Sequence, residues 1–347
     1  MSLILSKPSY PFDPIWTSEK LAKALRTELA ELEAVAAVAD RSYRPVQIEP
    51  GSTREVFSAK PRLKAIQRRI KEVILQRVGF PEYLTGSVKG RDYITNAKLH
   101  AGARILICED VSKFFPSVTA ERVHDIWRHF FGFGDEVARL LTKLTTKAGT
   151  LPQGASTSSY LANLVLWRDE PHLQAKLAEH GLTYSRYVDD MAMSSNLYIT
   201  PAEQERIIAD VYGVLRRNGL SAKRKKHEIS SSSQRMIVTK VIVNVKPSWS
   251  KARRSAVRTQ VYELEKRVAS GGDGTDLRKF ADRTSNLVGQ LGRFHAREAG
   301  LLRARVRNAR ETIYAAAQAF DATSKVPCAL QSSGHESPPP WETLLAQ

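Results

Sequence analysis

The chain lacks the residues and the long apolar runs that define several large protein classes. Only two of its 347 residues are cysteine, Cys108 and Cys328, and they lie far apart. This excludes a disulfide scaffold and a zinc module built on a CxxC motif. No apolar run approaches the about 18 residues of a membrane-spanning helix, and the mean hydropathy is −0.33. The start, MSLILSKPSYPFDP, has no basic leader and no cleavage signal. We therefore expect a cytoplasmic protein with no membrane partner.

Acidic residues are scarce relative to basic ones. The chain has 53 Lys and Arg against 36 Asp and Glu, a formal net charge of +17. Hydrophobic residues make up 42% of the chain, enough for the cores of about two ordinary domains. A pI near 9.9 favours a phosphate-rich partner, either nucleic acid or an anionic membrane surface. Because no membrane span is present, we expect nucleic acid.

The hydrophobic pattern predicts an α+β region followed by a basic helical one. Periodic or capped segments predict helices at 18–39, 61–75, 119–131, 134–147, about 155–180 and 201–219. β-Prone runs predict strands at 104–110 and on both sides of Asp189-Asp190, a strand or strand pair at 235–245, and a hairpin around Gly51. The middle of the chain therefore alternates strands and helices, with acids at strand ends.

The composition changes after residue 246. Between Lys246 and Arg310 we count 16 Lys and Arg against 6 Asp and Glu, in three helical stretches. Solvated helix faces would be the simplest interpretation. An excess of ten positive charges is hard to leave unneutralised, however, so a grip on nucleic-acid phosphates is favoured. From about Thr323 the chain is rich in Ser and Pro, which predicts a poorly ordered tail.

Three carboxylates stand within or at the ends of β-prone runs. They are Asp110 after RILICE, and Asp189-Asp190 within YSRYVDDMAMS. A single Asp-Asp pair is more often a solvated turn. Carboxylates gathered on one sheet repel one another unless cations neutralise them. Two magnesium ions about 4 Å apart, held by such acids, are a standard device for in-line nucleotidyl transfer.

Five sequence blocks resemble those of reverse transcriptases, which are RNA-directed DNA polymerases. In chain order they are DVSKFFPS (110–117), LPQGASTSSYLANL (151–164), YVDD (187–190), GLSAKRKK (219–226) and VTKVIVN (238–244). The resemblance runs from about Val46 to Asn244. It implies a right-hand polymerase with an antiparallel palm sheet. The implied divisions are an N-terminal helical extension at 1–45, fingers and palm at 46–246, a basic helical thumb at 247–322 and a tail at 323–347.

The resemblance also assigns catalytic roles. Asp110, Asp189 and Asp190 would be the catalytic carboxylates, and together with the backbone carbonyl of Val111 they would hold two Mg²⁺ ions. Phe115 stands where the family has a gate that rejects the ribose 2′-hydroxyl and so favours dNTPs. An ordinary core phenylalanine is the alternative for Phe115.

Four further residues would contact the incoming nucleotide: Arg54, Gln153, Gly154 and Lys226. Arg54 matches the fingers position that holds the triphosphate, and a solvated hairpin arginine is the alternative. Lys226 matches a possible proton donor to pyrophosphate. It lies in the run Lys223-Arg224-Lys225-Lys226, so a patch for backbone phosphates is an equal alternative.

A further element narrows the subfamily. ITNAKLH at 94–100 resembles the Asn-Ala-x-x-His element of retron reverse transcriptases. It implies RNA-binding roles for Asn96 and His100, with capping or core roles as the alternative. One departure is Val238-Thr239-Lys240, where retron enzymes usually have Val-Thr-Gly, and it leaves the identity of the RNA open. In the thumb, the arginines expected on RNA are Arg253, Arg254, Arg258, Arg303, Arg305 and Arg307.

The resemblance thus implies an RNA-directed DNA polymerase of retron type. It would use Mg²⁺ and dNTPs to copy part of a structured non-coding RNA, priming from a 2′-hydroxyl of that RNA. It would act in anti-phage defence with a separate effector protein. Two alternatives stay open: another defence-associated reverse transcriptase without a branched RNA–DNA product, and an inactive RNA-binding scaffold. A group II intron maturase fits less well, because nothing after residue 320 is expected to form a DNA-binding or endonuclease domain.

Overall fold

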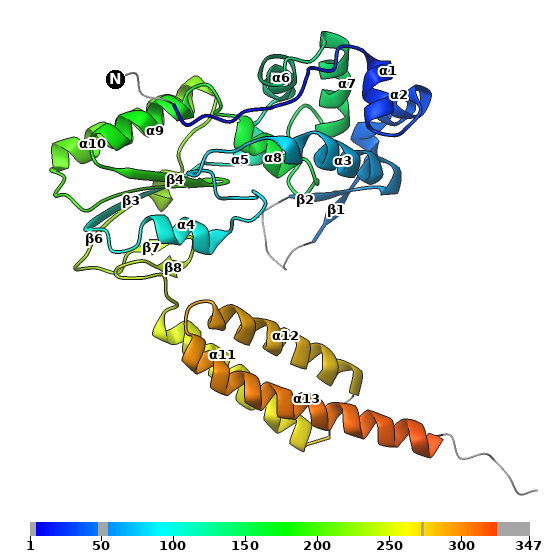
Figure 1. Ribbon diagram of the computed structural model, residues 1–347, viewed down its shortest axis with the longest axis vertical. Coiled ribbons are helices and arrows are strands. Elements are labelled where there is room, and N and C mark those ends of the chain that lie inside the picture. The colour runs from blue at the N-terminus through cyan, green and yellow to red at the C-terminus, as the bar shows by residue number, and fades with distance from the viewer. Residues whose placement is uncertain (1–4, 48–54, 272–273, 325–347) are drawn as a thin grey trace, which may run out of the picture. The chain divides into compact units, whose positions relative to one another are not determined.

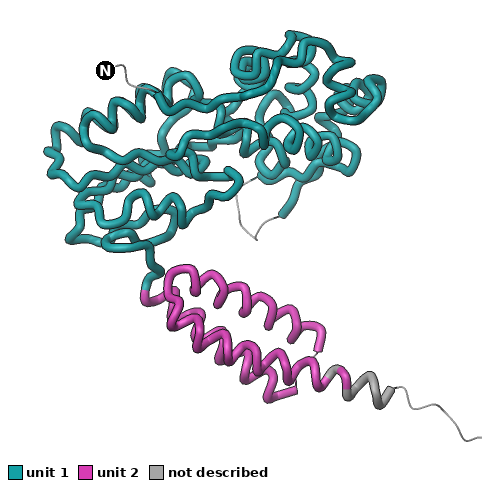
Figure 2. The backbone as a smooth tube through the Cα atoms, viewed as in Figure 1, with its two compact units in different colours: residues 1–250 teal, residues 251–347 magenta. Residues whose placement is uncertain are grey.

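The chain forms two compact units in the computed structural model, which describes residues 5–47, 55–271 and 274–324. One unit spans Met1–Ser250 and the other Lys251–Gln347, as coloured in Figure 2. Within the described ranges, no helix is both long and apolar enough to cross a membrane. The second unit begins at the first residue of helix α11, four residues after the start expected for the thumb.

The N-terminal helices belong to the first unit. α1 (Ser18–Ala24) begins after Thr17, whose side chain accepts a hydrogen bond from the Lys20 amide. α2 (Leu29–Ala37) packs on α7 (Asp135–Thr145) and α3 (Pro61–Val73). These helices share the hydrophobic core of the unit with the sheet described below.

The single helix predicted at 18–39 is wrong, because a Schellman motif ends α1. Arg26 has a φ of 52°. Its amide donates to the Lys23 carbonyl at 3.1 Å, and the Thr27 amide donates to the Ala22 carbonyl at 3.0 Å. This C-cap usually contains glycine. The sequence therefore carries no local signal for the break.

A four-stranded antiparallel sheet lies at the centre of the first unit. Its order is β4–β5–β3–β6, with bounds Thr183–Tyr187, Asp190–Ser195, Ile105–Asp110 and Glu228–Ser231. Figure 1 shows α9 (Glu170–Glu179) and α10 (Pro201–Arg217) along one face of this sheet. On the other side lie α4 (Tyr93–Leu99) and the strand pair β7 (Ile237–Val238) and β8 (Val241–Ile242). Side chains alternate along β3, so Glu109 and Asp110 face opposite sides.

Two helices replace the one predicted over about 155–180. α8 (Ser158–Leu164) ends before a turn, and α9 begins at Glu170 with Pro171 in its first turn. Proline has no amide hydrogen and its ring obstructs the preceding turn, so it starts a helix more readily than it continues one. The break buries Glu170, which is 1% exposed.

The remaining strand predictions are confirmed with shifted bounds. β1 (Tyr43–Val46) pairs with β2 (Val56–Ala59), while the predicted turn at Gly51 lies outside the described residues. The predicted strand at 235–245 is the β7–β8 hairpin. Its turn residues Thr239 and Lys240 have φ of 48° and 66°. Both lie in the left-handed region, where a two-residue hairpin turn favours glycine or asparagine.

Several short helical segments connect these elements, and three of them lie between β3 and α7. They are α5 (Phe114–Ser117), α6 (Ala120–Asp125), and the π-helical turn Ile126–Phe130 that continues α6.

The second unit is a bundle of three helices. They are α11 (Lys251–Ala269), α12 (Gly274–Gly292) and α13 (Ala296–Ser324). Buried residues such as Val261, Val288 and Val306 form its core. α13 extends through Ser324, so residues 323 and 324 of the expected tail belong to this helix. The rest of that tail, 325–347, lies outside the described residues.

Candidate functional site

The three aspartates lie together at one end of the sheet. Asp110 ends β3 and Asp190 begins β5, and the strand register pairs these two residues directly. Asp189 precedes Asp190 in the β4–β5 turn, and its carbonyl accepts a hydrogen bond from the Val111 amide at 3.0 Å. The hairpin therefore brings acids from two distant blocks of the sequence into one place.

Like charges crowd this site. Burial and the carboxylates of Asp189 and Asp110 raise the pKa of Asp190 to about 6. The Lys226 ammonium donates a hydrogen bond to the Asp110 carboxylate, and this contact raises the pKa of Lys226. The raised pKa of Asp190 means that the lysine does not compensate all of the negative charge. A divalent cation would neutralise the remainder.

The chemistry of these donors fits magnesium. Mg²⁺ prefers oxygen ligands and keeps several waters and substrate phosphates, so it needs few protein carboxylates. In the described part of the chain, no three His, Cys, Asp or Glu side chains already surround one point as a finished metal centre. Asp110, Asp189 and Asp190 would hold the ion, and Val111 follows Asp110 where its carbonyl is the expected further ligand.

The segment that carries Lys226 is fastened to the end of β3. The Lys223 amide donates to the Asp110 carbonyl at 2.7 Å, and the Ser112 amide donates to the Ser221 carbonyl at 2.8 Å. These main-chain bonds hold the basic run Arg224–Lys226 beside the aspartates. Lys226 itself is 43% exposed.

Glu109 is a buried carboxylate next to Asp110 in sequence to which sequence reasoning gave no role. Its side chain is fully buried on the sheet face opposite Asp110 and pairs with His227 Nδ1 at 2.6 Å. It also accepts a hydrogen bond from the Tyr212 hydroxyl at 3.2 Å. The signal in the sequence was the acid just before Asp110 in RILICED, because alternation along a strand sends adjacent acids to opposite faces.

The Gln153-Gly154 turn packs on strand β2. The Phe57 amide donates to the Gln153 carbonyl at 2.8 Å. Gly154 has a φ of 101°, and a Cβ there would lie 2.7 Å from the Phe57 carbonyl oxygen. Glycine is therefore required both by the backbone conformation and by the close approach. Arg54, predicted just before β2, lies outside the described residues.

Phe115 lies five residues beyond Asp110, within α5. It is partly buried and packs against the core beside Phe114, with ring centroids 5.9 Å apart. Phe114 is 3% exposed and is the core member of the pair. The partial exposure of Phe115 leaves part of its ring available to a substrate.

The expected RNA contacts of Asn96 and His100 do not fit their placement, because each is only 1% exposed. Asn96 Oδ1 accepts a hydrogen bond from the Thr85 hydroxyl at 2.8 Å. The His100 ring bridges the hydroxyls of Ser185 and Ser194, each at 2.7 Å. We correct the prediction accordingly: these side chains join α4 to the sheet interior.

Burial of His100 predicts a loss of stability in acid. Burial lowers its pKa to about 4, while an unfolded histidine titrates near 6.5. The unfolded state then binds more protons between these values, so the free energy of unfolding falls as pH drops from about 6.5 to 4, by about 3 kcal/mol in total. His100→Gln should lose this part of the slope in urea unfolding measured at several pH values. If the free energy of unfolding depends on pH in the same way in the variant and the wild type, His100 is not the group responsible.

Five of the six arginines expected on RNA fall into two groups in the second unit. Arg254 and Arg258 bind Glu298 at 2.8 and 2.5 Å, and Arg305 binds Glu265 at 2.6 Å. These ion pairs link α11 to α13. The predicted set therefore does not form one free basic stripe.

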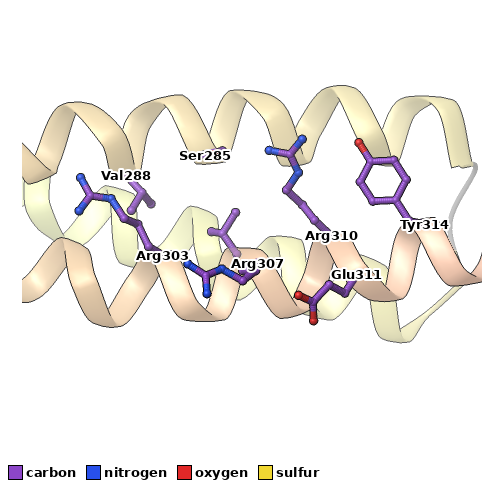
Figure 3. Close-up of a pocket in the computed structure, with 8 residues that line it drawn as sticks. Ser285, Val288, Arg303, Arg307, Arg310, Glu311 and Tyr314 are labelled. Carbon is purple, nitrogen blue, oxygen red and sulfur yellow. The ribbon is translucent and has the colours of Figure 1, made fainter.

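The second group, Arg303 and Arg307, lines a groove between α12 and α13. Arg310, which was not among the expected arginines and pairs with Asp282 at 3.2 Å, lines it too. Arg303, Arg307 and Arg310 come from successive turns of α13, as Figure 3 shows. The groove has a volume of about 440 Å³, and its other lining residues include Ser285, Val288 and Tyr314. Guanidinium groups beside an apolar floor and an aromatic ring suit a phosphodiester with its attached base.

Comparison with known proteins agrees with the sequence blocks. Residues 42–255 match the reverse transcriptase (RNA-dependent DNA polymerase) family. The Retron Se72 reverse transcriptase of Salmonella heidelberg is 31% identical over 307 residues, which cover 86% of this chain and 81% of that protein. The Retron Ec48 reverse transcriptase of Escherichia coli is 31% identical over 298 residues, covering 81% and 72%. The Retron Ec86 reverse transcriptase, also from Escherichia coli, is 27% identical over 249 residues, covering 70% and 77%.

Among solved structures, telomerase from Candida albicans in complex with a TWJ fragment of telomeric RNA matches with a TM-score of 0.40 and 8% identity. The match covers 78% of this chain and 56% of that one. The family match and the retron relatives carry the assignment. The chain belongs to the retron reverse transcriptases and is an RNA-directed DNA polymerase.

Proposed function

We propose that this retron reverse transcriptase copies part of a structured non-coding RNA into DNA by two-metal nucleotidyl transfer at Asp110, Asp189 and Asp190. The observation that carries the proposal is the direct register pairing of Asp110 with Asp190. Burial of Asp190 and repulsion by Asp189 and Asp110, which together raise the pKa of Asp190 to about 6, also support it.

The chain's own residues would position the reactants. Bound magnesium would activate the primer hydroxyl and stabilise the leaving pyrophosphate. The ends of β3 and β5 fix the aspartates, and Lys226, whose ammonium bonds Asp110, would contact the triphosphate. Gln153 and Gly154 would lie against the incoming nucleotide, with Phe115 beneath its sugar. Arg54 is assigned to the triphosphate from its sequence position.

We assign the fingers and palm to 46–246 and the thumb to 247–322. The basic helices of the second unit suit a thumb that grips the RNA–DNA duplex. By family resemblance, the primer is a 2′-hydroxyl of the same RNA, and the enzyme acts in anti-phage defence in the cytoplasm with a separate effector. RNA-templated primer extension by the full chain, with Mg²⁺ and dNTPs, tests the central step. Extension by wild type but not by a variant without the Asp189 and Asp190 carboxylates supports it, and equal extension overturns it.

The α12–α13 groove should supply non-specific affinity for RNA. Each phosphate contact releases about one counterion, so Arg303→Gln with Arg307→Gln should flatten the slope of log affinity against log salt by up to about 2. Arg305→Gln is the matched control, since Arg305 lies on the same helix but is paired with Glu265. Filter binding over a salt series measures the slopes.

Competition between cognate and scrambled RNA separates two roles for this groove. Phosphate contacts carry no sequence information, so the double variant should lose affinity for both RNAs alike. Selective loss of cognate RNA with an unchanged salt slope would instead make the groove a reader of that RNA.

A further inference from the structure

The turn that presents Asp189 and Asp190 has an unfavourable backbone. β4 ends at Tyr187 and β5 begins at Asp190, so Val188 and Asp189 form a two-residue loop. Val188 has a φ of 61°. A β-branched residue in the left-handed region is a true outlier, and hairpin turns with positive φ at this position normally use glycine. Surrounding contacts must therefore hold this turn in place.

Arg186 supplies one such contact from beneath the turn. Its side chain is completely buried. Nη1 donates to the Val188 carbonyl at 3.0 Å, and Nη2 donates to the Asn163 carbonyl at 3.0 Å. One guanidinium therefore ties the turn to helix α8.

Glu170 holds that guanidinium in place. Its Oε1 accepts from Arg186 Nε at 2.6 Å and its Oε2 accepts from Nη2 at 2.8 Å, a two-pronged ion pair. Glu170 Oε1 also accepts from the Tyr184 hydroxyl at 2.7 Å. A planar guanidinium fixed on one edge by a carboxylate has its remaining donors aimed in a set direction. Here one of those directions is the Val188 carbonyl.

The segment from Tyr83 to Gly86 makes further contacts with this end of the hairpin. The Arg186 amide donates to the Tyr83 carbonyl at 2.8 Å, and the Thr85 amide donates to the Arg186 carbonyl at 3.0 Å. Gly86 follows so closely that a Cβ there would lie 2.5 Å from the Val188 nitrogen. Asn163 Nδ2 donates to the Gly86 carbonyl at 2.7 Å.

We propose that Arg186, held by Glu170, is a positioning residue for DNA synthesis: it fixes the strained Val188 turn and thereby the placement of Asp189 and Asp190. This inference rests on the proposed role of those aspartates. This role accounts for the two hydrogen bonds that Arg186 donates to the Val188 and Asn163 carbonyls in addition to its ion pair with Glu170.

The test replaces the pair by apolar residues. A buried ion pair exchanged as a whole for apolar side chains often costs little stability, whereas removing one partner leaves an unpaired buried charge. Arg186→Met with Glu170→Met should therefore fold, melt as one transition and bind RNA. Because misplacement by about 1 Å can cost on the order of 100-fold, its kcat should fall by about that factor, with a much smaller change in the KM for dNTP.

Two further variants make the result specific to the turn. Tyr184→Phe removes a hydrogen bond to the same Glu170 but none to the turn, so its kcat should stay near that of wild type. Adding Val188→Gly to the Met pair should recover at least about tenfold in kcat, because glycine adopts positive φ without strain. A merely stabilising ion pair would not be rescued in this way.

The Arg186→Met, Glu170→Met variant would overturn the proposal if it folds and its kcat stays within about threefold of wild type. A loss of kcat that Val188→Gly leaves unchanged would also overturn it.

If that double variant does not fold, Gly86→Ala tests the placement of the turn instead. Its Cβ must displace the turn, and kcat should fall while the variant still folds and binds RNA. Gly213→Ala in α10 meets only ordinary contacts and is its control, while full activity of Gly86→Ala would overturn the proposal. An Asp189→Asn, Asp190→Asn variant measured in parallel separates the two ideas, since full activity there means that the proposed metal site itself is wrong.

Discussion

Asparagine at both Asp189 and Asp190 should abolish DNA synthesis and leave the fold intact. The substitutions keep the size of the side chains and the main-chain bond from the Val111 amide to the Asp189 carbonyl. They remove two of the three carboxylates that would hold magnesium. Loss of the metal removes many kcal/mol of barrier lowering, so residual primer extension should be below about 1% of wild type.

The same variant should be no less stable than wild type when magnesium is chelated. Burial and the neighbouring carboxylates raise the pKa of Asp190 to about 6, which means that the folded state disfavours its ionised form. Neutral asparagine relieves this repulsion. Thermal melting in EDTA and RNA binding in the same buffer check the fold. Asp210→Asn on α10 is the control for a lost surface carboxylate. Extension above about 1% in a folded double variant would rule out the aspartate assignment.

Valine at Phe115 should let ribonucleotides enter. An aromatic ring under the sugar rejects a 2′-hydroxyl by bulk, so removing it should raise the ratio of NTP to dNTP use by at least about tenfold. Phe114→Val is a close control, because Phe114 is the fully packed member of the pair. That variant should lose stability through the cavity it leaves while keeping its nucleotide preference. Single-nucleotide incorporation with dCTP or CTP opposite a template guanine measures both ratios.

An unchanged preference in Phe115→Val would make Phe115 an ordinary core residue. Equal relaxation in both variants would point to a general loosening of α5 rather than to a gate. Melting temperatures of the two proteins distinguish this case, since loosening should lower both.

The convergence of the aspartates was predictable because strands and hairpins obey short-range rules. A run of β-prone residues on each side of Asp189-Asp190 implies a tight hairpin, and its pairing with the strand that ends at Asp110 follows the family resemblance. Helix α10 was also predictable from the sequence. Thr200 and Glu203 form a capping box at its start, and Gly219 follows its end with a φ of 70°.

The supports of the site were not predictable, because they depend on pairings with no local signal. Glu170 and Arg186 are 16 residues apart and meet only because the chain breaks before α9. Asn96 and His100 share a helical face, which is equally typical of a binding surface and of a packed interior. The tertiary contacts with Thr85, Ser185 and Ser194 show that this face packs in the protein interior.

The nucleic acid that co-purifies with the full chain tests the central claim most directly. The protein would be expressed together with the structured non-coding RNA proposed as its template. The bound nucleic acid would be sequenced, and separate aliquots would be digested with RNase or DNase to identify each strand as RNA or DNA. Wild type should carry DNA complementary to part of that RNA and joined to it through a 2′-hydroxyl, and the Asp189→Asn, Asp190→Asn variant should carry the RNA alone. RNA without DNA in both preparations, or the same DNA in both, would contradict RNA-directed DNA synthesis at this aspartate turn.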